Sequence, residues 1–207
     1  MDAFSEILSA VKLNGALYFN AEFSAPWGVN TPPSRQLAPL LAPGAPHLVI
    51  YHLVIDGSAF AHMEGRSVAL HPGDVVVLPH GDPHVMTSEI GLAEWRESLA
   101  VERKVQARDF TMLEAGGGGE RTRLVCGFMS CDPQLSRPIL TGLPPIFKVN
   151  LRADRSGQWL ESSILHLVEE ASSGTVGSDA MLAKLSEALF VDTLRRYLAA
   201  LPERETG

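Results

Sequence analysis

The distribution of apolar residues divides the chain into two parts with different periods. From residue 16 to residue 129, short apolar or alternating runs are separated by turns rich in glycine, proline and aspartate. Runs of this length with β-branched and aromatic residues favour strands over helices. We therefore predict strands at Ala16–Ser24, Leu48–Ile55, Ser58–Met63, Ser67–Leu70, Asp74–Leu78 and Arg121–Met129. Short strands at regular spacing with glycine turns indicate a mainly β domain, a sandwich or a barrel.

The last third of the chain is helical in its pattern. Apolar residues recur at helical spacing in Gln158–Ala171 and in Asp179–Ala200, and we expect Ser178 to cap the second helix. The apolar face of this second helix is wider than one helix seam, so it should pack on its neighbour and on a further surface. We interpret that further surface as a second subunit and predict a homodimer. A short helix is also predicted from Asp2 to the Asn14-Gly15 stop.

The connecting segments are less distinct. Thr31–Pro46 holds five prolines and is predicted to be a loop packed on the barrel. Ile90–Ala107 is predicted to be a loop with a helical turn, Gly116–Gly119 a flexible loop, and Pro138–Leu143 one helical turn. Residues 1–150 are thus expected to form the barrel with an N-terminal helix, and residues 151–207 a helical hairpin.

Composition and charge restrict the function. The chain has 207 residues, 45% of them hydrophobic and 20% charged, which is typical of a globular protein. It shows neither a signal peptide nor an apolar run of roughly 20 residues, so we expect no membrane partner. Two cysteines without an export signal favour the cytoplasm over a disulfide framework. A net charge of −7 makes direct binding of nucleic acid by these residues improbable, because phosphate contacts need a basic surface.

Candidate metal chemistry centres on the stretch from Leu70 to His84. A β-branched run there ends at Pro79, and His80 and His84 follow in a glycine turn. Cys126 and Cys131 lie at the end of the strand predicted at 121–129. Two histidines with two cysteines suit tetrahedral zinc, and four protein ligands give a structural rather than a catalytic site. If the two strands are neighbours, the four side chains meet at one rim. The alternative is a buried free Cys126, a half-exposed Cys131 and two solvated imidazoles.

Three further residues are candidates for binding a small effector. His52 lies in an apolar strand, where a hydrogen-bonded core or pocket histidine is the commoner outcome. His62 and Glu64 share one side of a strand that could line the barrel interior, or equally form an exposed face. The sequence shows no Ser-His-Asp order and no paired carboxylates, so we expect no catalytic residues.

Taken together, these segments resemble the N-terminal cupin-type regulatory domain of AraC-family transcription regulators. The resemblance rests on residues 15–19 and 24–28, on Tyr51-His52-Leu53-Val54 before Gly57, on residues 72–84, on residues 123–127 and on the terminal helix pair. It implies a cupin-like double-stranded β-barrel (jelly roll) followed by an antiparallel helix pair. It also implies effector sensing and dimerisation, with DNA bound by a helix-turn-helix domain that follows the helix pair. Since the chain stops at Gly207, it either continues in nature or is a stand-alone sensor.

The sequence departs from enzymatic cupins at one point. Their first motif resembles a glycine followed by His-x-His and a glutamate, whereas Gly57 is followed only by His62-Met63-Glu64. The three-histidine, one-glutamate centre of cupin dioxygenases is therefore not intact, and we expect no enzyme. A metal-dependent cupin enzyme of the dioxygenase or isomerase type and a stand-alone small-molecule-binding cupin stay as alternatives.

Overall fold

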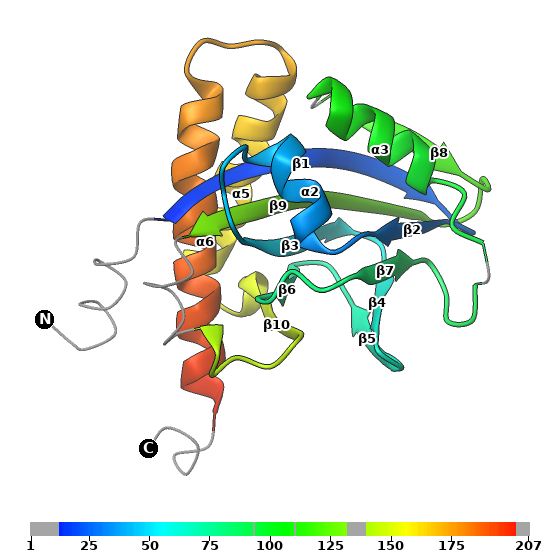
Figure 1. Ribbon diagram of the computed structural model, residues 1–207, viewed down its shortest axis with the longest axis horizontal. Coiled ribbons are helices and arrows are strands. Elements are labelled where there is room, and N and C mark those ends of the chain that lie inside the picture. Colours follow the sequence, from blue (N-terminus) through cyan, green and yellow to red (C-terminus); the bar gives the residue numbers. More distant parts are fainter. Residues whose placement is uncertain (1–12, 93, 110, 132–139, 202–207) are drawn as a thin grey trace, which may run out of the picture.

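The computed structural model describes residues 13–92, 94–109, 111–131 and 140–201. Two β-sheets face each other, and a helical hairpin covers the outer side of the larger one (Figure 1). The expected mainly β architecture, followed by an antiparallel helix pair, is confirmed. The helix predicted from Asp2 lies outside the described residues up to residue 12. Of the turn predicted at Pro138–Leu143, residues 140–143 are described and form a turn in which the Leu143 N–H donates to the Leu140 carbonyl at 3.1 Å.

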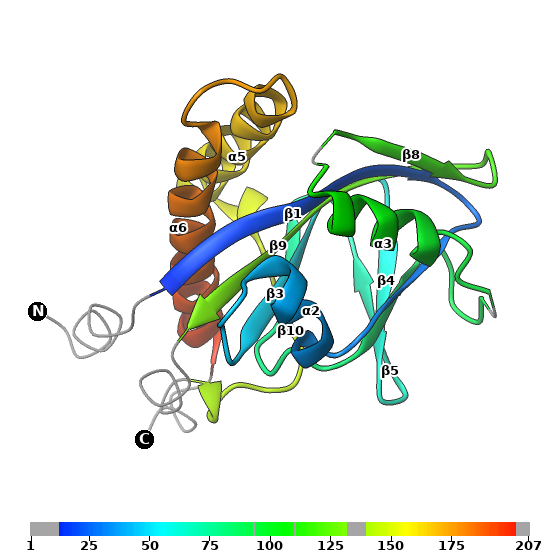
Figure 2. The same cartoon turned by 45° about the horizontal axis from the view of Figure 1, so that its top comes forward.

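The larger sheet has six strands in the order β10-β6-β3-β9-β1-β8. In chain order these are β1 (Leu13–Ser24), β3 (Leu48–Asp56), β6 (Asp74–Leu78), β8 (Leu113–Gly116), β9 (Arg121–Cys131) and β10 (Phe147–Asn150). The β1–β8 pair is parallel and the other pairs are antiparallel. The long strands β1 and β9 run side by side across the molecule (Figure 2).

The smaller sheet has four antiparallel strands in the order β2-β7-β4-β5. They are β2 (Gly28–Thr31), β4 (Ala59–Met63), β5 (Arg66–Leu70) and β7 (His84–Thr87). Every strand predicted from the sequence is confirmed, with ends that differ by a few residues. The strands β2, β7, β8 and β10 were not predicted, because each has only four residues and no clear alternation.

The helices are α2 (Ser34–Leu41), α3 (Ser98–Ala107), α5 (Arg155–Ser172) and α6 (Ser178–Ala200), with a 3₁₀ turn η1 at Leu151–Ala153. The prediction of a loop at Thr31–Pro46 is wrong for Ser34–Leu41, which form α2. This helix buries Ser34 and Ala38, and its packing on the barrel outweighs the cost of Pro39 inside it. The single helical turn predicted within Ile90–Ala107 is also wrong, since α3 spans ten residues.

Two apolar clusters lie on the two faces of the larger sheet. In β3, Ile50 and Val54 belong to the interior cluster between the sheets, whereas Tyr51 and Leu53 belong to the outer cluster beneath the helix pair. Because both faces are covered, β3 shows no polar alternation. The outer cluster joins the barrel and the helical hairpin in one core.

The wide apolar face of α6 packs within the chain. Leu189, Phe190 and Leu194 are buried against α5 and the larger sheet, and the Tyr51 hydroxyl donates to Ser186 Oγ at 2.9 Å. The further surface on which the second helix was expected to pack is therefore the larger sheet of the same chain, and not a second subunit. Ser178 is not the cap: its hydroxyl donates to the Thr175 carbonyl, and the N-cap position is Gly177, with φ 87°. None of the described helices is both long and apolar enough to cross a membrane.

Candidate functional site

A buried polar cluster lies inside the barrel and joins its two sheets. Cys126 on β9 is the register partner of His52 on β3, and the even-numbered side chains of both strands point into the interior. The Cys126 Sγ is 2.8 Å from His52 Nδ1, and His52 Nε2 is 2.7 Å from His84 Nε2. His84 opens β7 of the opposite sheet, so the contact between the histidines spans the interior.

The direction of every hydrogen bond in this cluster follows from the Asp82 carbonyl oxygen, which is the acceptor at the end of the series. His84 Nδ1 lies 3.0 Å from the Asp82 carbonyl oxygen, which can only accept, so Nδ1 carries the proton. In neutral His84 the Nε2 atom then accepts from His52 Nε2–H, and the His52 Nδ1 atom accepts from the Cys126 thiol. One set of tautomers thus satisfies all three side chains without a charge.

Burial favours this neutral state. His52 and His84 are each 2% exposed and Cys126 is 5% exposed. Burial, and then the nearby His84, hold the pKa of His52 well below its ordinary value. Burial lowers the pKa of His84 to about 4, although its bond to the Asp82 carbonyl acts in the opposite direction. Burial also raises the pKa of the Cys126 thiol, so it is a poor nucleophile at neutral pH.

The structure brings only His84 and Cys126 of the four predicted zinc ligands into one cluster. Their strands were expected to be neighbours, but β3 lies between β6 and β9 and places His52 there. His80 Nε2 instead donates to the Leu143 carbonyl at 3.1 Å. Cys131 lies five residues beyond Cys126 on β9, a backbone separation of about 16 Å, whereas each Zn–S bond is about 2.3 Å.

His52 does not complete a metal site in this geometry. It uses its two ring nitrogens for different partners, so His84 and Cys126 lie on opposite sides of the ring. Across the described ranges, no group of three or more His, Cys, Asp or Glu side chains is placed to hold a metal ion. The arrangement fits a hydrogen-bonded series better than a coordination sphere.

His62 and Glu64 lie on the outer side of the smaller sheet, not in the barrel interior. Ala59, Ala61 and Met63 of β4 belong to the interior cluster, so His62 points the other way. Glu64 is exposed in the β4–β5 turn with φ 48°. Both residues line a shallow depression of about 340 Å³ that reaches His84.

His62 has no ring nitrogen available for a ligand. Its Nε2 is 2.7 Å from Thr87 Oγ1, whose own proton goes to the Glu89 carbonyl, so Nε2 donates. Its Nδ1 then accepts from Ser67 Oγ, also at 2.7 Å. Partial burial lowers the pKa of His62, which keeps this neutral form at neutral pH.

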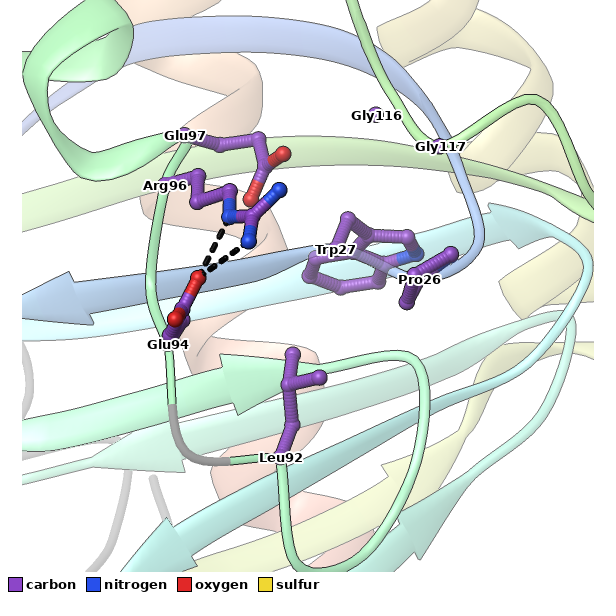
Figure 3. A pocket seen from close by; sticks show the side chains of 8 residues that line it. All are labelled: Pro26, Trp27, Leu92, Glu94, Arg96, Glu97, Gly116 and Gly117. Carbon is purple, nitrogen blue, oxygen red and sulfur yellow. Dashed lines mark hydrogen bonds and ion pairs between the residues drawn. The ribbon is translucent and has the colours of Figure 1, made fainter.

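A separate cavity of about 380 Å³ opens beside the end of β1, and the sequence did not reveal it (Figure 3). Pro26 and Trp27 line one side and Leu92 another, while Glu97 and Arg96 lie opposite the indole. Gly116 and Gly117 complete the wall, with Glu94 paired to Arg96. The cavity is built from three segments that are far apart in the chain, which is why no local motif marks it.

Hydrogen bonds hold these three segments in place. Gly117 N–H donates to the Ser24 carbonyl at 2.7 Å and Gly119 N–H to the Ala25 carbonyl at 2.8 Å. The glycine run predicted to be flexible is therefore bonded to the end of β1. The Gly28 N–H donates to Glu97 Oε2 at 2.8 Å, which fixes the start of α3 against β2.

Comparison with known proteins identifies the fold family. The chain matches the family described as Cupin (Cupin_6) over residues 2–199. It is 22% identical over 206 residues to the HTH-type transcriptional regulator AlkR of Acinetobacter baylyi, covering 98% of this chain and 63% of that protein. It is 24% identical over 203 residues to the RCS-specific HTH-type transcriptional activator RclR of Escherichia coli, covering 96% and 57%. The chain thus spans about three-fifths of these relatives.

Solved structures of regulators also match at lower similarity. The AraC-like transcriptional activator CuxR has a TM-score of 0.41 and 12% identity, covering 95% of this chain and 55% of that one. ToxT of Vibrio cholerae, solved with an unsaturated fatty acid bound, has a TM-score of 0.39 and 11% identity, covering 90% and 55%. The predicted resemblance to cupin-type regulators is confirmed by the family and its two curated relatives.

Proposed function

The chain belongs to the cupin family, and from that premise we propose that it is the effector-sensing and dimerisation domain of an AraC-type bacterial transcription regulator. The observation that supports this most is its alignment over nearly its whole length with two HTH-type regulators that are longer than it is. The cavity beside Trp27 supplies a place for a small effector. We assign no catalytic role, because the buried cluster is neutral and its thiol is not activated.

We propose that DNA is bound only by a helix-turn-helix domain outside this chain. The 207 residues carry a net charge of −7, so they neutralise few phosphates, and that electrostatic contribution supplies most non-specific affinity. A regulator of bacterial DNA works in the cytoplasm, which is where we place the protein. Salt-sensitive binding of this chain alone to duplex DNA would contradict the proposal.

We propose a homodimer that uses the outer side of the helix pair. Trp159 on α5 and Met181 on α6 are 65% and 57% exposed, although most apolar residues of both helices are buried within the chain. Exposed large apolar side chains of this kind are typical of interfaces. Sedimentation at tens of micromolar should give a dimer, and a Trp159→Glu, Met181→Glu double variant should give a monomer with unchanged secondary structure.

A reporter fusion tests the sensing role. The chain is joined to a DNA-binding domain that represses its operator only as a dimer, and reporter output is followed while candidate effectors are added. We expect repression by the fusion and a change in repression with at least one small molecule. Output equal to that of the DNA-binding domain alone, under every condition, would contradict both dimerisation and sensing.

Zinc is a second candidate ligand, in a reduced form of the predicted site. His84 and Cys126 are the two predicted ligands that share one cluster, and neutral imidazole with thiolate is a donor pair that zinc accepts. Binding would require the His52 ring to turn away. Elemental analysis of the purified wild type, Cys126→Ser and His84→Ala measures the bound zinc. Stoichiometric zinc in the wild type and none in the two variants would support the site. A wild type without zinc would rule the site out.

A further inference from the structure

We propose that the cavity beside Trp27 binds a small organic amine that also carries a hydroxyl or carbonyl oxygen. The proposal rests on the proposed function only in naming this occupant as the effector. The volume of about 380 Å³ lies at the lower end of the range for small-molecule sites, which is roughly 300–1,000 Å³. The expected ligand is therefore compact.

Two polar groups in the cavity wall have no partner among the described residues. Trp27 is 1% exposed, and no described residue accepts a hydrogen bond from its Nε1. Glu97 is 9% exposed. Its Oε2 accepts from the Gly28 N–H, whereas its Oε1 accepts from no described group and is not one of the fully buried unpaired atoms. Buried polar groups are nearly always bonded, so these two groups favour an occupant of the cavity that can pair with both. That ligand offers an acceptor to the indole and a donor to the carboxylate.

The charge balance of the wall selects a cation. Arg96 and Glu94 form an ion pair with each other, with Arg96 Nε 2.6 Å from Glu94 Oε2. Glu97 takes part in no ion pair among the described residues, which leaves the wall with one uncompensated negative charge. A buried carboxylate is costly unless a cation pairs with it, and an ammonium group supplies both the charge and the N–H donors.

The apolar part of the wall selects a flat ligand body. Pro26, Trp27 and Leu92 form that part, and the indole can also attract a cation through its ring face. Trp27 additionally stacks on Phe23, with ring centroids 4.9 Å apart, and belongs to the interior cluster of the barrel. An occupant of the cavity therefore touches a side chain that is part of the core, which gives its binding a route to the rest of the domain.

Isothermal titration calorimetry with three matched probes tests the ligand class on the purified chain. Tyramine has both the ammonium and the hydroxyl, phenethylamine lacks the hydroxyl, and 3-(4-hydroxyphenyl)propionate has a carboxylate in place of the ammonium. We expect one tyramine per chain. Phenethylamine should bind about threefold more weakly, because the indole N–H stays unpaired. The acid should bind at least about tenfold more weakly, because it meets the Glu97 carboxylate.

Three variants locate the binding. Glu97→Gln keeps an oxygen for the Gly28 N–H but loses the charge, so tyramine affinity should fall about tenfold. Arg96→Gln releases Glu94 and adds a negative charge to the wall, so tyramine affinity should rise. Glu102→Gln, an exposed carboxylate on α3 that does not line the cavity, is the matched control and should leave it unchanged. Circular dichroism confirms that each variant is folded.

The opposite results overturn the inference. Tighter binding of the acid, or weaker tyramine binding by Arg96→Gln, means that the cavity is built for an anion around the guanidinium. No heat from any probe at millimolar concentration means that it is not a site for this class. If the reporter fusion responds to other molecules while tyramine fails, this inference falls and the proposed sensing function stands. If tyramine binds but the reporter fusion responds to no molecule, this inference stands and the proposed sensing function falls.

Discussion

Protonation of the buried histidines should make the stability of the domain fall with pH in a defined window. The pKa of His84 is lowered by burial from 6.5 to about 4, and burial and the nearby His84 hold the pKa of His52 well below 6.5. In the unfolded chain an imidazole takes up a proton near pH 6.5, whereas the folded protein excludes that proton until about pH 4 for His84. Unfolding therefore takes up protons in this interval, and the free energy of unfolding decreases as pH falls.

The magnitude follows from the shift in the His84 pKa. A change of one pKa unit corresponds to about 1.4 kcal/mol, so His84 alone should remove about 3 kcal/mol between pH 6.5 and pH 4. His52 contributes with the same sign. Asp74 acts at lower pH: burial by itself raises its pKa, but its bonds from Lys148, Asn150 and the His71 N–H keep the pKa below 3.8. The interval from pH 6.5 to 4.5 thus reports mainly on the two buried histidines, with a contribution of the same sign from His62, whose pKa is also lowered.

Urea denaturation followed by circular dichroism, at pH steps from 7 to 4.5, measures this effect. His84→Gln should lose about 1 to 3 kcal/mol at pH 7, because the His52 N–H loses its acceptor. The same variant should show a shallower pH dependence than the wild type. His71→Gln, which changes an exposed histidine, should show the wild-type dependence. A wild-type profile that is flat over this interval, or equal slopes for wild type and His84→Gln, would refute the neutral hydrogen-bonded series.

Three further substitutions test the packing around the site by the same denaturation assay at pH 7. Tyr51→Phe should cost about 1 to 2 kcal/mol, because the buried Ser186 hydroxyl loses its partner; no loss would mean that this bond is not formed in solution. Arg152→Met should cost about 2 to 3 kcal/mol, because Glu161 is 5% exposed and keeps its charge without a partner, and rescue by Glu161→Gln in the double variant checks the cause. Gly127→Ala should cost about 1 to 3 kcal/mol, because the added Cβ would lie 2.1 Å from the Tyr51 ring; a variant as stable as the wild type would show that the ring moves at no cost.

The fold could be predicted largely because local and global signals agree. The run Asp74–Leu78 lies between glycine turns and forms β6 with the predicted bounds. The 3.6-residue period of Asp179–Ala200 coincides with α6. The prediction failed where tertiary packing decides the local structure. In α2, Pro39 and its neighbours favour a loop, yet burial of Ala38 on the barrel holds them in a helix.

The candidate site was only partly predictable, because residue types do not reveal strand order. The zinc set assumed that the strands ending at Leu78 and Met129 are neighbours, and the sheet inserts β3 between them. For His52, the sequence favoured a hydrogen-bonded core or pocket position over a ligand-binding one, and its ring is buried with both nitrogens in hydrogen bonds. Glu97 carried no signal, because its partner Gly28 is 69 residues away in the chain. Trp27 lies within residues 24–28, which support the family resemblance, but nothing in that segment indicates a cavity.

The regulator role is tested most directly in the organism that carries the gene, by measuring transcripts genome-wide in three strains. One strain lacks the gene, one carries it intact, and one carries it with Glu97→Gln in the proposed effector cavity. The account predicts that loss of the gene changes a small set of transcripts. It also predicts that the substitution alters the response of the same set to the effector while the protein level stays normal. Unchanged transcripts in the strain without the gene, under conditions where the protein is made, would contradict the account.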